Sequence, residues 1–194
     1  MIVKIHGTNG SGKSTLVREI MRVYKMRPEP GERPRQYSTL LLPGQPLEKR
    51  WETVRILGPY RTACGGMDAL SSPDGVALVS QYTKVRESVV FFEGVLFSTT
   101  YGALGALSER SLVKWVYVFL DTPAEVCTAR VLERRAAKGN DKPFDPERSL
   151  VPKIRAVGSV RRKAEAAGHL TYTVNHKDSP RVAVNKLLKF LEGV

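Results

Sequence analysis

The sequence is poor in cysteine and in long apolar runs. It holds two cysteines among 194 residues, Cys64 and Cys127, and their isolated positions fit no metal or disulfide spacing. Few cysteines suit a reducing compartment. No apolar stretch approaches the ~20 residues of a membrane span, and the chain enters an apolar run, MIVKI, at its first residue, which leaves no room for a signal peptide. We therefore expect a cytoplasmic protein with no membrane partner.

Acidic residues are also scarce, with 19 Asp and Glu against 31 Lys and Arg, for a net charge of +12. The excess lies in two segments. Residues 25–61 carry eight Lys/Arg and four Asp/Glu, a net +4, and residues 130–163 carry eleven and four, a net +7. Solvated faces usually mix the two signs, so two basic segments predict a polyanionic partner. The alternative is that a site for small phosphate compounds needs several of these cations itself.

The stretch HGTNGSGKST, residues 6–15, completes the pattern G-x-x-x-x-G-K-S, the P-loop or Walker A motif. It stands between an apolar run that predicts a strand and Leu16, Ile20 and Val23 at helical spacing. Backbone N–H groups of such a loop bind phosphates, Lys13 reaches the β- and γ-phosphates, and the Ser14 hydroxyl holds Mg²⁺. An accidental glycine-rich turn is the alternative, but the complete and correctly flanked motif favours a nucleoside triphosphate site. Its expected nucleotide ligands are Gly7, Thr8, Asn9, Gly10, Ser11, Gly12, Lys13, Ser14 and Thr15.

Strand and helix signals alternate along the chain, which predicts one α/β domain over residues 1–194: a parallel sheet of five strands with helices on both faces. Residues 35–42 and 51–58 predict the arms of an antiparallel β-hairpin inserted at 28–61, with an irregular glycine-rich loop after it. Helices are expected from the cap at Ser72 to about residue 87, over 149–167, and after the cap at Ser179. Residues 122–125 have the form of a capping box before another helix.

Two carboxylates are candidates for the chemistry. Glu93 ends the buried run VVFFE, at the carboxyl edge of the sheet beside the P-loop, where an acidic residue can hold Mg²⁺ through water. The alternative is a solvated strand-end glutamate. Asp68 follows the glycine-rich loop, which can approach a phosphate acceptor, so that Asp68 takes or orients the proton of the acceptor hydroxyl. The alternative is that Asp68 caps the next segment. Further acceptor-binding residues are expected on the loop, Arg61, Gly65 and Gly66, and in the basic segment 25–61, Arg33, Arg35 and Tyr60, with Tyr60 or Trp51 stacking on a base.

Cationic and polar residues near the second basic segment complete the expected site. Arg130 and Arg134 lie one helical turn apart, with Arg135 adjacent, before the loop at 139–149. A segment that brings guanidinium groups onto a transferring phosphoryl group is a typical lid, so residues 130–163 are predicted as a basic lid; a solvated basic helix is the alternative. Asn175, His176 and Lys177 follow the last strand, where a purine pocket or a plain surface loop are both consistent with the sequence.

The motifs GTNGSGKST, FFEG and VFLDTPAEVCTARVLERR, with the terminal strand–loop–helix, resemble the P-loop kinases of the nucleoside and nucleotide kinase group. The resemblance covers roughly residues 1–24 and 73–194, and implies ATP with Mg²⁺ and phosphoryl transfer to a hydroxyl or phosphate. It carries over Lys13, Ser14, Glu93, Arg130 and Arg134 as site residues. Asn175 and Lys177 are the expected ligands of the purine.

The central portion departs from the thymidylate kinases. Those enzymes have Asp-Arg-Tyr or Asp-Arg-His where this chain has Glu93-Gly94-Val95, so their substrate arginine is absent. The hairpin and the loop GPYRTACGGMD resemble a bacteriophage branch of P-loop kinases, some of whose members phosphorylate 5-hydroxymethyluridine within DNA. A phage-encoded protein would act in the host cytoplasm.

We therefore expect an ATP-dependent kinase of the hydroxymethyl group of a modified pyrimidine in DNA, a step in DNA hypermodification. The base must leave the stack to reach Lys13, and the basic segments would bind the DNA backbone. A phage deoxynucleoside monophosphate kinase, acting on a nucleotide substrate, is the first alternative. A nucleic-acid-stimulated ATPase is the second.

Overall fold

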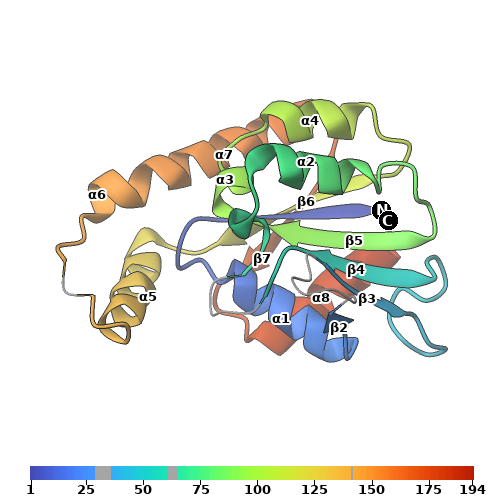
Figure 1. Cartoon of the computed structure of the whole chain (residues 1–194), viewed down its shortest axis with the longest axis horizontal. Coiled ribbons are helices and arrows are strands. Elements are labelled where there is room, and N and C mark those ends of the chain that lie inside the picture. Colours follow the sequence, from blue (N-terminus) through green and yellow to red (C-terminus); the bar gives the residue numbers. More distant parts are fainter. Residues whose placement is uncertain (29–35, 61–64, 141) are drawn as a thin grey trace.

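The computed structural model of the chain describes residues 1–28, 36–60, 65–140 and 142–194. Within these ranges a sheet of seven strands runs through the centre of the molecule, in the order β2-β3-β4-β5-β1-β6-β7 (Figure 1). Five neighbouring strands, from β4 to β7, are parallel, whereas β2 and β3 are antiparallel at one edge. The strands are β1 (Ile2–His6), β2 (Arg27–Pro28), β3 (Gln36–Leu40), β4 (Thr53–Leu57), β5 (Ser88–Glu93), β6 (Trp115–Asp121) and β7 (Leu170–Asn175).

The predicted hairpin is part of this sheet and not an appendage to it. Its two arms correspond to β3 and β4, which pair antiparallel as expected. β4 is also the fifth parallel strand, since it pairs with β5 along its whole length. Val54 and Ile56, which point to one face of β4, are fully buried, and so is Leu57, which points to the other, as expected for a strand whose two faces are both covered. The sheet therefore has two more strands than predicted, both at the hairpin edge.

Helices cover the sheet on both faces, so the expected three-layer arrangement is present (Figure 1). α1 (Lys13–Val23) and α8 (Pro180–Glu192) pack on one face, and α2 (Ser72–Ser80), α4 (Gly102–Glu109) and α7 (Val151–Ala166) pack on the other. The predicted inward residues of the last helix are buried in the first of these layers: Val184, Leu187, Leu188 and Leu191. A short 3₁₀ turn (Met67–Ala69), α3 (Val95–Ser98), α5 (Ala124–Ala136) and α6 (Pro146–Ser149) lie at or beyond the carboxyl edge of the sheet.

The predicted caps and ends of the helices agree only in part with the helix boundaries in the structure. The cap at Ser179 is confirmed, because its side chain accepts a hydrogen bond from the Val182 N–H. The helix predicted from Ser72 starts one residue earlier than expected, since Ser71 is its N-cap, and it ends at Ser80 and not near residue 87. The prediction over 149–167 corresponds to α7.

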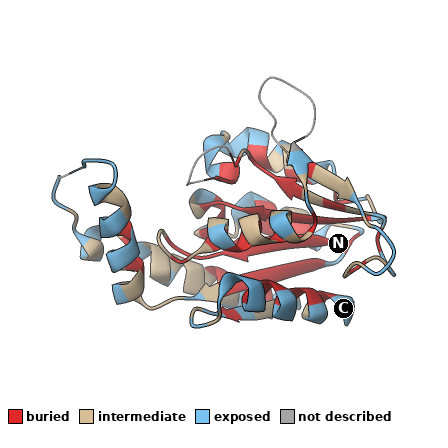
Figure 2. Ribbon diagram, turned by 90° about the horizontal axis from the view of Figure 1, so that it is seen from below, coloured by how far each residue is buried: buried red, intermediate tan, exposed pale blue. Residues whose placement is uncertain are grey.

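A segment of the molecule projects away from the sheet. α5, α6 and the first half of α7 extend from the body, and most of their surface is exposed (Figure 2). We call residues 124–158 the basic arm. None of the helices in the described part of the chain combines the length and the apolar character needed to cross a bilayer.

Candidate active site

The P-loop joins β1 to α1 at the carboxyl edge of the sheet, in the place that the sequence predicts. Gly10 and Gly12 have φ angles of 80° and 100°, in the left-handed region that favours glycine. Gly10 also approaches α5 so closely that a Cβ there would overlap the carbonyl oxygen of Cys127. These two glycines therefore fix the curl of the loop and its contact with α5.

The side chain of Lys13 is held inside the loop. Its Nζ donates a hydrogen bond to the carbonyl oxygen of Thr8 at 3.1 Å, and the residue is 6% exposed. Burial lowers the pKa of Lys13, while the nearby carboxylates of Glu93 and Asp68 act in the opposite direction. A buried cation inside a loop of this kind is positioned to bind a phosphate.

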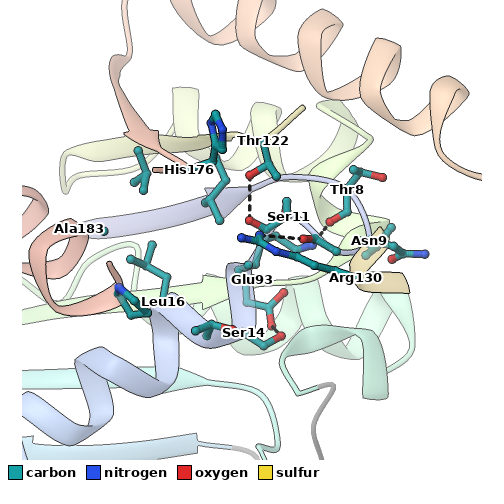
Figure 3. Close-up of a pocket in the computed structure, with 18 of the residues that line it drawn as sticks. Thr8, Asn9, Ser11, Ser14, Leu16, Glu93, Thr122, Arg130, His176 and Ala183 are labelled. Atoms are coloured by element: carbon teal, nitrogen blue, oxygen red, sulfur yellow. Dashed lines mark hydrogen bonds between the residues drawn. The ribbon is translucent and has the colours of Figure 1, made fainter. Parts of the chain in front are cut away.

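Glu93 lies beside the P-loop at the end of β5. Its Oε1 accepts a hydrogen bond from Ser14 Oγ at 2.7 Å, and the residue is 2% exposed (Figure 3). Burial raises the pKa of Glu93, and the charge of Lys13 and the Ser14 bond oppose that shift. The burial rules out a solvated strand-end glutamate. Among the described residues no cluster of three or more His, Cys, Asp or Glu side chains could hold a metal, so a cation here would complete its coordination with phosphate oxygens and water, as Mg²⁺ commonly does.

A cavity of about 600 Å³ runs along the P-loop (Figure 3). Sites for small molecules commonly have volumes of about 300–1,000 Å³, so this cavity has the size for a nucleotide. It gathers predicted site residues from segments far apart in the sequence. These are Thr8, Asn9, Gly10, Ser11, Gly12, Lys13, Ser14, Thr15, Gly65, Asp68, Glu93, Arg130, Arg134 and Asn175.

Asp68 combines the two roles that its sequence position left open. It lines the cavity and is exposed there. Its two carboxylate oxygens accept hydrogen bonds from the backbone N–H groups of Val95, at 2.7 Å, and Leu96, at 3.1 Å. Asp68 therefore caps α3, a segment remote in sequence. Two backbone donors fix the orientation of this carboxylate at the cavity wall.

The arginines of α5 divide into two groups. Arg130 and Arg134 both line the cavity. Nη1 of Arg130 donates to the carbonyl oxygen of Gly10 at 3.2 Å, so this side chain lies across the P-loop (Figure 3). Arg135 instead donates to the carbonyl oxygen of Lys142 at 2.6 Å. The two guanidinium groups at the cavity can serve a phosphate, whereas Arg135 supports the loop that follows α5.

The predicted capping box at Thr122 is wrong. Within the described part of the chain α5 has no side-chain cap at its start. The Thr122 Oγ1 instead donates to the carbonyl oxygen of Ser11 at 2.9 Å, a contact between residues 111 positions apart (Figure 3). Thr122 was not predicted as a site residue because the local pattern Thr-Pro-Ala-Glu is itself a capping signature.

The end of β7 contributes Asn175 to the cavity and the loop after it contributes His176, but not Lys177. Lys177 is exposed, and its backbone N–H donates to Asn175 Oδ1 at 3.0 Å. His176 Nδ1 hydrogen-bonds with the carbonyl oxygen of Asp121 at 2.9 Å. The other walls of the cavity near this loop are mostly apolar, and the apolar residues were not predicted because their spacing is that of ordinary core residues. These walls are Leu16, Leu120, Val174, Asp178, Pro180 and Ala183.

Other predicted residues lie outside this cavity. Gly7 lines a smaller cavity that adjoins the P-loop, and Gly66 packs against Glu93, where a Cβ would come within 2.6 Å of Oε1. Tyr60 and Trp51 are 8% and 9% exposed, and both rings belong to the core beside the sheet, which leaves little ring surface for stacking on a base. Three predicted substrate-binding residues lie outside the described part of the chain: Arg33, Arg35 and Arg61.

Comparison with known proteins identifies the family. A protein named 5-hmdU DNA kinase from Pseudomonas phage PaMx11 is 33% identical to this chain over 195 residues, which cover 97% of each sequence. The chain belongs to the 5-hmdU DNA kinase family. Proteins of the same name from Pseudomonas phage M6 and Delftia phage PhiW-14 are 30% and 26% identical, over 86% and 91% of this chain and 86% and 68% of their own lengths. No protein-family model matches the chain.

Solved structures agree with the fold of this 5-hmdU DNA kinase family member. Shikimate kinase from Acinetobacter baumannii has a TM-score of 0.52 at 15% identity, and a gluconokinase from Sinorhizobium meliloti 1021 has a TM-score of 0.50 at 17% identity. Each comparison covers 99% of this chain and 93% of the other. At such identities the similarity shows the fold alone, which is the predicted P-loop kinase fold. Family membership confirms the predicted phosphotransferase, and a kinase requires a nucleotide phosphate donor, generally with Mg²⁺.

Proposed function

We propose that the chain transfers the γ-phosphate of ATP to the hydroxymethyl oxygen of 5-hydroxymethyluracil in DNA. The observation that carries this proposal is a single cavity that holds both Lys13 and Asp68. It occurs in a chain that matches a protein named 5-hmdU DNA kinase over 97% of its length. A phosphate site and a fixed carboxylate side by side are what phosphoryl transfer to a hydroxyl requires.

The residues present fit ATP and Mg²⁺. Lys13 is ready to exchange its bond with the Thr8 carbonyl for a bond with a phosphate. The adjacent oxygens of Ser14 and Glu93 can hold the ion, directly and through water. Mg²⁺, when bound, neutralises charge on the phosphates of the donor. Asn175 and His176 line the cavity next to apolar walls, where the purine has space.

The chain's own residues supply the rest of the chemistry. The hydroxymethyl oxygen of the acceptor forms a bond to the γ-phosphorus, the bond from that phosphorus to the β,γ-bridging oxygen breaks, and ADP leaves. Asp68 takes the hydroxyl proton, and the backbone donors of Val95 and Leu96 keep its carboxylate in place. Lys13, Arg130 and Arg134 stabilise the charge on the transferring group.

The basic arm supports DNA as the acceptor. Lys138, Arg148 and Arg155 are exposed on it, and Arg130 and Arg134, which line the cavity, belong to its first helix. A single nucleotide offers few phosphates to so many cations, whereas a DNA strand offers a regular series of them. The same surface would place a long acceptor next to the P-loop.

Labelled ATP and a panel of acceptors test this function. We expect label in an oligonucleotide that contains 5-hydroxymethyluracil and none in the same oligonucleotide with thymine, which lacks the hydroxyl. Transfer to free dTMP, with none to the modified oligonucleotide, would instead identify a deoxynucleoside monophosphate kinase. Release of inorganic phosphate stimulated by unmodified DNA, without transfer, would identify an ATPase.

A further inference from the structure

A second, smaller cavity lies between the P-loop and the first half of α7. Its volume is about 160 Å³, against about 600 Å³ for the cavity along the P-loop. The two share part of their walls, since Thr8, Ser11, Leu120 and Thr122 line both. The remaining walls are Gly7, Phe119, Asp121, Ile154, Val157, Gly158 and Arg161. Nucleotide-sized ligands need about 300 Å³ or more, so this cavity has room for a much smaller group, such as one ring.

Two hydroxyl groups in the wall of this cavity are buried without a partner. Thr8 and Ser11 are each 4% exposed. Within the described residues, neither Thr8 Oγ1 nor Ser11 Oγ has a hydrogen-bond partner. Lys13 and Thr122 bond only to the backbone carbonyl oxygens of these two residues. A buried hydroxyl without a partner costs free energy and calls for an explanation, and a bound ligand with polar edges provides one.

Gly158 points to a ligand at the same place. It lies in the interior of α7, where glycine is less favourable than alanine. The protein itself does not require it, because a Cβ at this position would find only Arg162 Nη1, at 3.8 Å, among atoms outside the backbone of the helix. Since Gly158 lines the cavity, its missing side chain leaves free space there. A glycine that no protein neighbour explains is expected where a ligand approaches the backbone closely.

We infer that this cavity receives the pyrimidine ring of the acceptor base, extruded from the DNA; the inference rests on the function proposed above. A flat ring would lie against Gly158, with Ile154 and Val157 beside it. The hydroxyls of Thr8 and Ser11 would pair with its carbonyl and imide groups, because a hydroxyl can both donate and accept. The hydroxymethyl substituent would extend past Thr8 towards Lys13. Gly158 is thus a specificity-determining position and not a catalytic residue.

Two substitutions of Gly158 test this assignment. Gly158→Ala adds one methyl group to the cavity wall, and Gly158→Leu fills much of the space. For the alanine variant we expect kcat/KM for the modified oligonucleotide to fall about tenfold or more, because one methylene in a fitted pocket changes discrimination by about 10–200-fold. The leucine variant should lose more. KM for ATP should stay unchanged in both, and the melting temperature of Gly158→Ala should be at least that of the wild type, because alanine favours the helix.

The control is Ala166→Leu, which adds side-chain bulk at an exposed position of the same helix and should keep wild-type kinetics. Wild-type kcat/KM for the modified oligonucleotide in both Gly158 variants would overturn the inference while leaving the proposed function intact. A rise in KM for ATP alone would assign the cavity to the donor and also overturn it. If the wild-type protein transfers no label to the modified oligonucleotide, the proposed function fails first, and the inference falls with it.

Discussion

The P-loop and the basic arm both carry positive charge, but in opposite settings. Lys13 is 6% exposed and bonded to the Thr8 carbonyl, whereas Lys138 and Arg155 on the arm are exposed. A buried charge acts strongly on one partner, while exposed charges are screened by water and salt and act weakly one at a time. A catalytic cation and a binding surface can therefore be separated by the size and the salt dependence of single substitutions.

The largest effect is expected at Lys13. Lys13→Ala should lower phosphoryl transfer by roughly 10³-fold or more, because it removes the buried cation that stabilises charge on the transferring group. Circular dichroism and thermal melting should show a folded protein. Lys138→Ala, a lysine of the arm, is the matched control and should retain nearly full kcat. Wild-type turnover by folded Lys13→Ala protein would remove Lys13 from the mechanism.

A smaller effect is expected where the arm meets the P-loop. Arg130→Ala and Arg134→Ala should each lower kcat by about 10²-fold and change KM for ATP much less, because charge on the transferring group is greatest in the transition state. Lysine at either position should restore little, since it cannot form the planar two-pronged contact of a guanidinium. Arg135→Ala, whose side chain supports the Lys142 backbone, is the control. Full kcat in both cavity variants would show that neither Arg130 nor Arg134 acts on the transferring group.

The same comparison explains how much the sequence could predict. The P-loop is contained in ten consecutive residues, so its backbone conformation and the placing of Lys13 and Ser14 follow from local pattern. The position of Glu93 also follows, because it ends a strand next to β1 and strand ends of a parallel sheet share one edge. Four of the five parallel strands, β1, β5, β6 and β7, were predicted from apolar runs next to helical segments, whereas β4 was recognised only as a hairpin arm and its parallel pairing with β5 was not foreseen.

Features that depend on packing between distant segments were not predicted. The bond from Thr122 to Ser11 joins positions 111 residues apart, and Asp68 caps α3 from another loop. Tyr60 precedes polar residues in the sequence, yet its ring is buried. The ring packs so closely on Gly65 that a Cβ at position 65 would overlap it. No periodicity within a segment carries such information, because the partner lies elsewhere in the chain.

On the arm, single substitutions should change salt dependence more than turnover. Each phosphate that the protein neutralises contributes about −0.9 to the slope of log affinity against log salt on duplex DNA and about −0.7 on single strands. Arg155→Glu and Lys153→Glu should each flatten that slope by about one such contribution, as measured by DNA binding over a salt series. Lys189→Glu, an exposed lysine of α8 on the other face of the sheet, should leave the slope unchanged. If all three variants kept the wild-type slope, the arm would not be the surface that binds DNA.

The smallest effect tests whether the P-loop depends on its link to the base of the arm. Thr122→Val keeps the shape of the side chain but removes the hydroxyl that donates to the Ser11 carbonyl oxygen. The free energy of unfolding should fall by about 1 kcal/mol, the usual contribution of one such hydrogen bond, and chemical denaturation measures this. Thr122→Ser keeps the donor and should recover most of the loss.

The control is Thr128→Val, which removes a hydroxyl that bonds only within α5, to the Ala124 carbonyl oxygen. It measures how far the free energy of unfolding falls when a hydrogen bond is lost that does not connect α5 to the P-loop. If Thr122→Val also raises KM for ATP and Thr128→Val does not, the bond holds the phosphate-binding conformation of the loop. If the two variants behave alike in both measurements, the phosphate-binding conformation of the loop does not depend on the Thr122 bond.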